Sequence, residues 1–305
     1  MILHRNLRRY RAALLWACSL LVLALAAATT RAEPFPAGAS QGTLNVGDES
    51  IEIYTYKPAE YKGGPLLLVL HGLGRNAPGY RDYAQPLADR YGFLVVAPLF
   101  DRKRFPAWRY QAGGITRDIS DSYEGDVGLE PESRRMGATL NALIGMVRKV
   151  EGAPALPYSM IGHSAGGQAL SRYAAFAPGD ARRIVIANPS TYLWPTRDIR
   201  FPYGYGGLPE ALTNDEALRR YLAQPIVLLL GAADVKRDRD LNVRPGAMQQ
   251  GPNRYERGHN FYAAAQRIAQ ERGWDFRWRL IEVPGVGHSA RRMLGADEAA
   301  GAFSN

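Results

Sequence analysis

The chain has 305 residues, of which 46% are hydrophobic and 22% charged, so it can bury a core and is not intrinsically disordered. A single cysteine excludes a scaffold held by disulfide bonds within the chain. The formal net charge of +9 would suit a protein that binds nucleic acid or a membrane surface, unless the basic residues are concentrated in one segment.

The first 32 residues have the three parts of a secretory signal peptide. Residues 1–11 contain four arginines and no acidic residue, residues 12–28 are almost wholly apolar, and small residues surround a cleavage position after Ala32. About 17 apolar residues are marginal for the alternative, an uncleaved membrane anchor, which needs roughly 20. Removing residues 1–32 leaves 33 basic against 29 acidic side chains, a net charge of +4, and no cysteine. We therefore expect a protein exported to the periplasm or medium that binds neither nucleic acid nor, after cleavage, a membrane.

Residues 33–305 are predicted to form a single α/β domain. Period-two alternation predicts antiparallel strands at 44–46 and 51–56. Continuous apolar runs, typical of strands buried on both faces of a parallel sheet, occur at 65–70, 93–97, 159–161, 184–187 and 226–230, with a weaker run at 278–283. Helical patterns lie between them at 80–91, 131–150, 165–176, 209–222 and 261–272. This alternation predicts a mostly parallel sheet with helices on both faces and an antiparallel N-terminal edge.

One motif points to a nucleophile. The run Gly162-His163-Ser164-Ala165-Gly166 stands between a predicted strand and a predicted helix. This is the context of a nucleophile elbow, a strained turn that presents a serine hydroxyl above the sheet. The glycines permit the tight turn, and the helix N-terminus favours a developing negative charge. We predict that Ser164 is a catalytic nucleophile.

A serine nucleophile needs a general base, and the base needs an acid that orients it. His288 follows the last predicted strand in a glycine-containing loop and is the expected base. Asp234 follows the strand at 226–230 after a turn of small residues and is the expected acid. Asp238 and Asp240, in the charged run that comes next, are the alternatives.

Acyl transfer also requires backbone donors for an oxyanion. One expected donor is the N–H of Ala165, directly after the nucleophile. The second is expected from the loop His71-Gly72-Leu73-Gly74, which follows an early strand. We predict the N–H of Leu73, with Gly74 as second choice.

Together these residues resemble the α/β-hydrolase superfamily, because His71–Gly74, Gly162–Gly167, Asp234 and His288 occur in the order typical of that family. The elbow, the His-Gly loop and the export signal are similar to the secreted esterases, a group with polyhydroxybutyrate-depolymerase-like and feruloyl-esterase-like proteins. The resemblance implies hydrolysis of a small-molecule or polymeric ester through an acyl-enzyme, without metal or organic cofactor. The alternatives are a peptidase on the same scaffold and a catalytically silent binding protein. No pattern indicates an oligomeric state.

Aromatic residues on predicted loops are candidate substrate contacts. Tyr192 and Trp194 follow the strand at 184–187. Trp108 precedes Arg109, whose guanidinium is a candidate contact for a carboxylate of the substrate. Such residues can line an apolar pocket, or they can pack an irregular loop onto the core.

Overall fold

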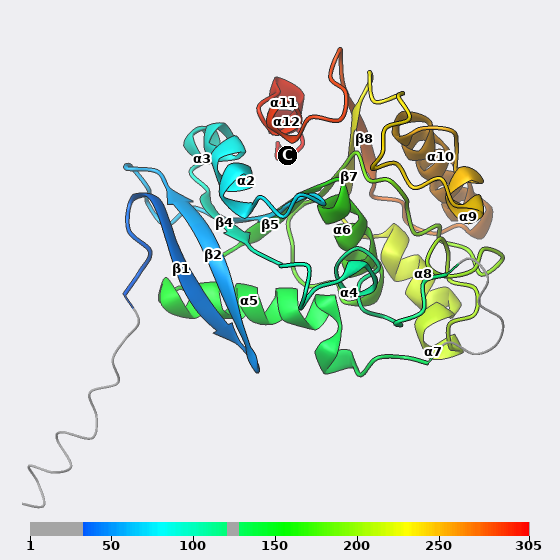
Figure 1. Cartoon of the computed structure of the whole chain (residues 1–305), viewed down its shortest axis with the longest axis horizontal. Coiled ribbons are helices and arrows are strands. Elements are labelled where there is room, and N and C mark those ends of the chain that lie inside the picture. The colour runs from blue at the N-terminus through cyan, green and yellow to red at the C-terminus, as the bar shows by residue number, and fades with distance from the viewer. Residues whose placement is uncertain (1–32, 121–127, 305) are drawn as a thin grey trace, which may run out of the picture. The chain divides into compact units, whose positions relative to one another are not determined.

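One eight-stranded sheet forms the centre of the computed structural model, which describes residues 33–120 and 128–304 (Figure 1). The strands are β1 (Gly38–Val46), β2 (Glu49–Lys57), β3 (Leu66–Leu70), β4 (Leu94–Pro98), β5 (Tyr158–His163), β6 (Ile184–Ala187), β7 (Ile226–Gly231) and β8 (Arg279–Val283). Their order across the sheet is β1-β2-β4-β3-β5-β6-β7-β8. The pairs β1–β2 and β2–β4 are antiparallel and the other neighbours are parallel. The predicted fold class, including its antiparallel N-terminal edge, is confirmed.

The predicted signal peptide, residues 1–32, lies outside the described residues. Contacts between residues separate the protein into two units, Met1–Pro34 and Phe35–Asn305. Every helix and strand described here belongs to the second unit. Within the described residues, no helix has the length and apolar character needed to cross a bilayer.

Two apolar layers lie on the two faces of the sheet, because successive side chains of a strand point in opposite directions. In β3, Leu66, Leu68 and Leu70 belong to one buried cluster. Leu67 and Val69 belong to the other. This arrangement explains why the strand is apolar at every position.

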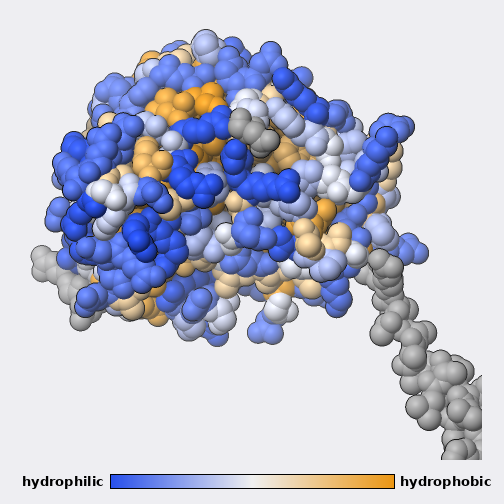
Figure 2. Space-filling model, turned by 180° about the vertical axis from the view of Figure 1, so that it is seen from behind, coloured by the Kyte–Doolittle hydropathy of each residue, from blue (hydrophilic) through white to orange (hydrophobic). Residues whose placement is uncertain are grey.

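Helices cover both layers. The first cluster receives residues from α5 (Met136–Val150), α6 (Ala165–Phe176), α8 (Asp215–Leu222) and α10 (Arg254–Arg272). The second receives residues from α2 (Ala77–Tyr83), α3 (Gln85–Tyr91), α11 (Ala290–Leu294) and α12 (Asp297–Gly301). Figure 1 shows α2, α3, α11 and α12 on one side of the sheet and α5, α6 and α8 on the other. Seen from behind, the surface is mostly hydrophilic, with apolar residues in small patches (Figure 2).

Three predicted helices are interrupted in the structure. The pattern predicts single helices over 80–91, 131–150 and 209–222, and each consists of two pieces. Ala84 separates α2 from α3, and Arg135 separates the short 3-10 helix Glu132–Arg134 from α5. Asn214 separates α7 (Glu210–Thr213) from α8, and its side chain accepts a hydrogen bond from the Ala217 N–H at 2.9 Å. Apolar periodicity continues across these breaks, so it does not reveal them.

The helix predicted from residue 261 begins earlier, at Arg254, with Asn253 as its N-cap. Gly258 weakens the helical pattern there because glycine is a poor helix former. A Cβ atom at this position would lie 2.5 Å from Leu230 Cδ2, so glycine is needed for α10 to approach β7. Four short helices have no counterpart in the prediction, namely α4 (Ala107–Tyr110), α9 (Pro245–Met248), α11 and α12. The first seven residues of α10 were likewise not predicted.

Candidate active site

Ser164 occupies a sharp turn between β5 and α6, with φ 57° and ψ −114°. Positive φ is rare for a residue with a side chain and stores strain, which functional sites often retain. A Cβ at Gly162 would lie 2.4 Å from the Gly166 carbonyl oxygen, and a Cβ at Gly166 would lie 2.3 Å from the Leu70 carbonyl oxygen. The backbone therefore folds back too closely for side chains on either side of Ser164.

Gly166→Ala is expected to destabilise the protein by about 1–3 kcal/mol, because its methyl group would displace the β3 backbone. Gly145→Ala is the matched control, since a Cβ there meets nothing within 4 Å. Alanine in the exposed middle of α5 should instead stabilise by roughly 0.5–1 kcal/mol. Urea unfolding curves of the two variants measure both effects, and equal stabilities would contradict the close approach.

The structure brings the three predicted catalytic side chains together. His288 Nε2 lies 3.0 Å from Ser164 Oγ, and His288 Nδ1 lies 2.7 Å from Asp234 Oδ2. Each residue follows a parallel strand, so all three stand at the carboxyl edge of the sheet. Backbone hydrogen bonds join the loops after β7 and β8, from Ala232 N–H to the Val283 carbonyl at 3.0 Å and from Ala233 N–H to the Val286 carbonyl at 2.9 Å.

The second oxygen of Asp234 faces a buried arginine. Arg254 Nη1 lies 3.3 Å from Asp234 Oδ1, and the same guanidinium makes two 2.8 Å hydrogen bonds to Asp238. Arg254 has no exposed surface, and its hydrogen bonds, together with its charge, lower the pKa of Asp238 to about 2. Of the three candidate acids, Asp234 contacts His288, Asp238 contacts Arg254, and Asp240 lies beside the exposed Arg239.

The predicted oxyanion donors lie next to Ser164. Ala165 is the first residue of α6, so its N–H is one of the four amides that have no partner within the helix. A Cβ at Gly72 would lie 3.6 Å from Ser164 Cβ, which places the loop containing Leu73 and Gly74 beside the serine. Both backbone segments can therefore reach an anion formed at Ser164.

His71 holds this loop in place, a role that the sequence does not reveal. Its Nδ1–H donates to the Gly72 carbonyl at 3.0 Å, and its Nε2 accepts from the Phe100 N–H at 3.1 Å. The Tyr110 hydroxyl donates to the His71 carbonyl at 2.7 Å. Burial lowers the pKa of His71 to about 4, so the imidazole is neutral, as these two roles of its nitrogens require.

His71 is expected to make stability depend on pH. Its pKa falls from 6.5 to about 4 on folding, so between these values the unfolded chain binds a proton that the native state does not. Stability should therefore decrease as the pH falls from 6.5 to 4, by up to about 3 kcal/mol from this residue. His71→Gln should be less stable at pH 7 but lose less over this interval. Urea unfolding at several pH values measures both slopes, and identical slopes would contradict this expectation.

The other two histidines among the described residues, His163 and His259, differ in position. His163 is buried beneath the site, with its ring centroid 4.7 Å from that of His288 and its Nδ1 3.0 Å from the Tyr80 hydroxyl. Burial lowers its pKa well below the ordinary value, so it adds a neutral wall beside His288. His259 lies within α10, 2.8 Å from the Glu282 carboxylate and outside the site.

A cleft of about 310 Å³ extends from Leu73 and is also lined by Gln168, Arg172 and Thr191. Leu73 belongs to the predicted oxyanion loop, and Gln168 stands one helical turn after Ser164, whose carbonyl accepts from the Gln168 N–H at 3.0 Å, so the cleft begins within one turn of the elbow. In the part of the chain that the structure describes, no three His, Cys, Asp or Glu side chains are grouped to hold a metal ion.

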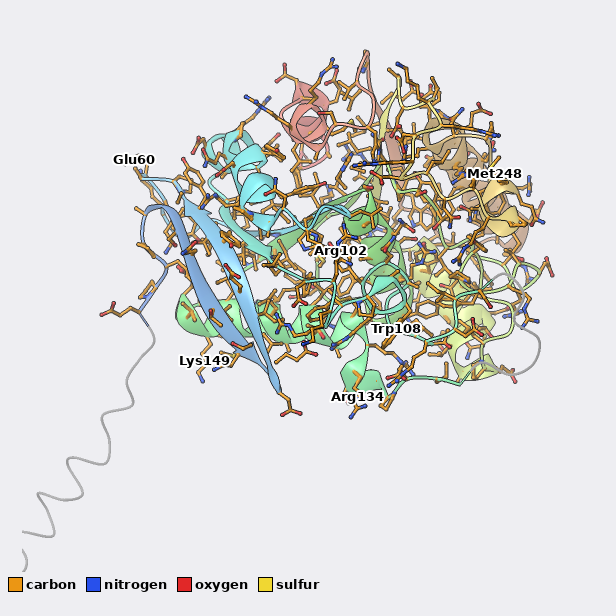
Figure 3. All side chains as sticks on the ribbon, viewed as in Figure 1. Glu60, Arg102, Trp108, Arg134, Lys149 and Met248 are labelled. Carbon is orange, nitrogen blue, oxygen red and sulfur yellow. The ribbon has the colours of Figure 1, made fainter. Side chains whose placement is uncertain are left out.

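The aromatic residues predicted to contact substrate do not line this cleft. Tyr192 is fully buried and stacks on Phe261 with centroids 4.5 Å apart, so it belongs to the core. Trp194 packs against the same core. Trp108 lines a second cleft together with Arg134 (Figure 3), and Arg109 pairs with Glu49. Tyr192 has no exposed surface with which to contact a substrate, because the loop after β6 turns this ring inward.

No protein-family model and no curated protein sequence matches the chain. The structure is similar to poly(aspartic acid) hydrolase-1 from Sphingomonas sp. KT-1, with a TM-score of 0.79 and 30% identity over 87% of this chain and 98% of that one. It is similar to the poly(3-hydroxybutyrate) depolymerase LpqC from Bordetella parapertussis, with a TM-score of 0.77 and 32% identity over 87% and 90% of the two chains. Siderophore hydrolase EstA from Aspergillus nidulans shares the fold alone, with a TM-score of 0.52 and 11% identity over 88% and 93%.

Proposed function

The chain belongs to the α/β-hydrolase superfamily, and on this basis we propose that it is an exported serine hydrolase that cleaves carboxylic esters through an acyl-enzyme intermediate. The observation that carries the proposal is the continuous series of contacts from Ser164 Oγ through His288 to Asp234, at 3.0 and 2.7 Å. Both distances are within hydrogen-bond reach, which a nucleophile, its base and the orienting acid require.

In the proposed reaction, Ser164 Oγ attacks the ester carbonyl carbon while His288 Nε2 takes the hydroxyl proton. Asp234 keeps the proton of His288 on Nδ1 and stabilises the imidazolium. The amides of Ala165 and Leu73 donate to the oxyanion. His288 then returns its proton to the leaving alcohol, and the acyl group remains on Ser164. A water molecule, deprotonated by His288, attacks this ester. His288 then gives the proton to Ser164 Oγ as its bond to the acyl carbon breaks, which releases the carboxylic acid.

Arg254 and Asp238 act here as positioning residues. The Asp234 carboxylate must present one oxygen to His288, and Arg254 holds the other. Asp238 compensates the remaining charge of the buried guanidinium through its two 2.8 Å hydrogen bonds. Arg254 and His288 therefore contact different oxygens of the Asp234 carboxylate, which fixes its orientation toward the imidazole.

Amide hydrolysis is the second candidate, because two relatives of 30% and 32% identity differ in substrate by name. One is named for poly(aspartic acid), whose units are joined by amide bonds, and the other for poly(3-hydroxybutyrate), a polyester. The elbow and the oxyanion loop would serve either bond, since both reactions pass through a tetrahedral oxyanion.

The decisive experiment combines labelling with a substrate panel. A fluorophosphonate probe should add its mass to the peptide that contains Ser164, which a catalytically silent binding protein would not allow. The labelled protein should lose hydrolysis of p-nitrophenyl esters of graded acyl length. Poly(3-hydroxybutyrate) and poly(aspartic acid), supplied in parallel, separate esterase from amidase activity. Absence of labelling at Ser164 would contradict the proposed mechanism.

Export is proposed from residues 1–32 alone. Mass spectrometry of protein recovered from the periplasm or medium should find a chain that begins at Glu33. Retention of the complete chain in the cell would contradict this part of the proposal.

A further inference from the structure

The cleft beside Ser164 carries a surplus of positive charge. Its described lining includes Arg172 at the inner wall, Arg239 and Arg244 at the rim, and one acidic residue, Asp240. Arg102, labelled in Figure 3, adds a fourth guanidinium next to the oxyanion loop, because its Nη2 donates to the Leu73 carbonyl at 2.8 Å.

Arg172 is unusual because it is a buried cation held by neutral partners. It is 2% exposed. Its Nη1 donates to the Gln168 and Thr191 carbonyls at 3.4 and 3.2 Å, and its Nη2 donates to the Pro202 carbonyl at 2.6 Å. Burial lowers the pKa of Arg172 to about 10, so it stays protonated at neutral pH.

The charge of Arg172 has no counter-ion among the described residues, and its Nε–H has no hydrogen-bond partner there. A buried charge is costly unless it is paired. Arg254 shows the usual solution, since it is equally buried but faces two carboxylates. A second buried cation, Arg257, donates to the carbonyl of Ser190 in the wall of the same cleft and raises its positive potential further.

We propose that this cleft binds a carboxylate group of the substrate, so that the enzyme prefers esters bearing a carboxylate near the scissile bond over neutral esters of the same length. The inference rests on the proposed function and names its substrate class. A guanidinium is suited to this task because its planar donors match the two oxygens of a carboxylate. Arg172, fixed by three carbonyls, pays little entropy on binding, while Arg239 and Arg244 attract the anion from solvent.

Monoethyl esters of succinate, glutarate and adipate, each paired with the ethyl ester of the monocarboxylic acid of equal chain length, provide the test. Ethanol release gives kcat/KM for both members of each pair. The best anionic ester should exceed its neutral partner by about tenfold or more, as expected for hydrogen bonds to a charged group. Salt should reduce this preference, since the rim arginines are exposed.

Two variants should lower kcat/KM for the anionic esters more than for the neutral esters of equal length, and so reduce the preference. Arg172→Met should reduce the ratio of kcat/KM between the anionic and neutral esters by about tenfold. The double variant Arg239→Gln/Arg244→Gln should reduce the preference for the anionic ester by up to about fivefold. Because it leaves the buried Arg172 in place, it still tests the proposal if Arg172→Met does not fold. Arg219→Gln/Arg267→Gln, on the exposed faces of α8 and α10, makes the same change in net charge away from the cleft and should retain the full preference.

Glutarate binding to the Ser164→Ala protein, measured by calorimetry, tests the site without catalysis. One glutarate should bind per chain, and the rim variant should weaken its binding. Hydrolysis of neutral and anionic esters at equal rates, together with no glutarate binding, would overturn the carboxylate site and leave the proposed function intact. Glutarate binding without hydrolysis of any ester would overturn the proposed function and support the site.

Discussion

Ser164→Ala is expected to abolish ester hydrolysis, with kcat reduced by about 10⁵–10⁶-fold. The variant removes the oxygen that would form the acyl-enzyme and leaves His288 without a nucleophile to activate. The backbone amides and the cleft remain, so slow residual hydrolysis by water is expected. The strained φ of 57° belongs to the backbone and persists with alanine, because both residues carry a Cβ atom.

Stability should hardly change in Ser164→Ala, since one hydrogen bond of about 1 kcal/mol is lost. Ser171→Ala is the matched control. Ser171 is buried in the same helix and contacts the Tyr221 hydroxyl at 3.1 Å and the Leu193 N–H at 3.3 Å. This control should be destabilised by about 1–3 kcal/mol yet remain active. Turnover of p-nitrophenyl esters and urea unfolding distinguish the two variants, and an active Ser164→Ala protein would disprove the acyl-enzyme.

Local patterns were sufficient to locate Ser164, Asp234 and His288 at neighbouring positions of the fold. Each follows an apolar strand, and parallel strands bring their carboxyl ends to one edge, so chain distance does not matter. The three glycines around Ser164 indicate the tight turn by themselves, because few other local structures need three glycines so close together. The sheet was predictable for a similar reason: strands buried on both faces are apolar throughout.

Tertiary packing decided what the sequence could not show. Arg254 stands in the first turn of a helix, where an arginine is ordinarily solvated, and only the fold brings it to Asp234 and Asp238. Tyr192 has the same local surroundings whether its ring faces a cleft or the core. Gly258 weakens a helical pattern, while its reason for being glycine lies on β7. In each case the deciding partner is distant in the chain.

Asp234→Asn and Asp238→Asn are expected to separate the two carboxylates that share Arg254. Asp234→Asn should lower kcat by about 10⁴-fold, because a neutral amide neither stabilises the imidazolium nor fixes the proton on His288 Nδ1. Asp238→Asn leaves that contact intact and should lower kcat by no more than about tenfold, through a less firmly held Asp234. Measurement of kcat for one p-nitrophenyl ester with both variants provides the comparison.

The two variants should also differ in their response to acid. The pKa of Asp238 is lowered from 3.8 to about 2 by Arg254, so its contribution to stability is present above pH 3.8 and is lost as the pH falls toward 2. Asp238→Asn should therefore flatten the decrease in stability over that interval. If Asp238→Asn instead reduced kcat as severely as Asp234→Asn, Asp238 rather than Asp234 would have to orient His288. The 2.7 Å contact between His288 and Asp234 argues against that outcome, since Asp238 could reach the histidine only if Arg254 first released it.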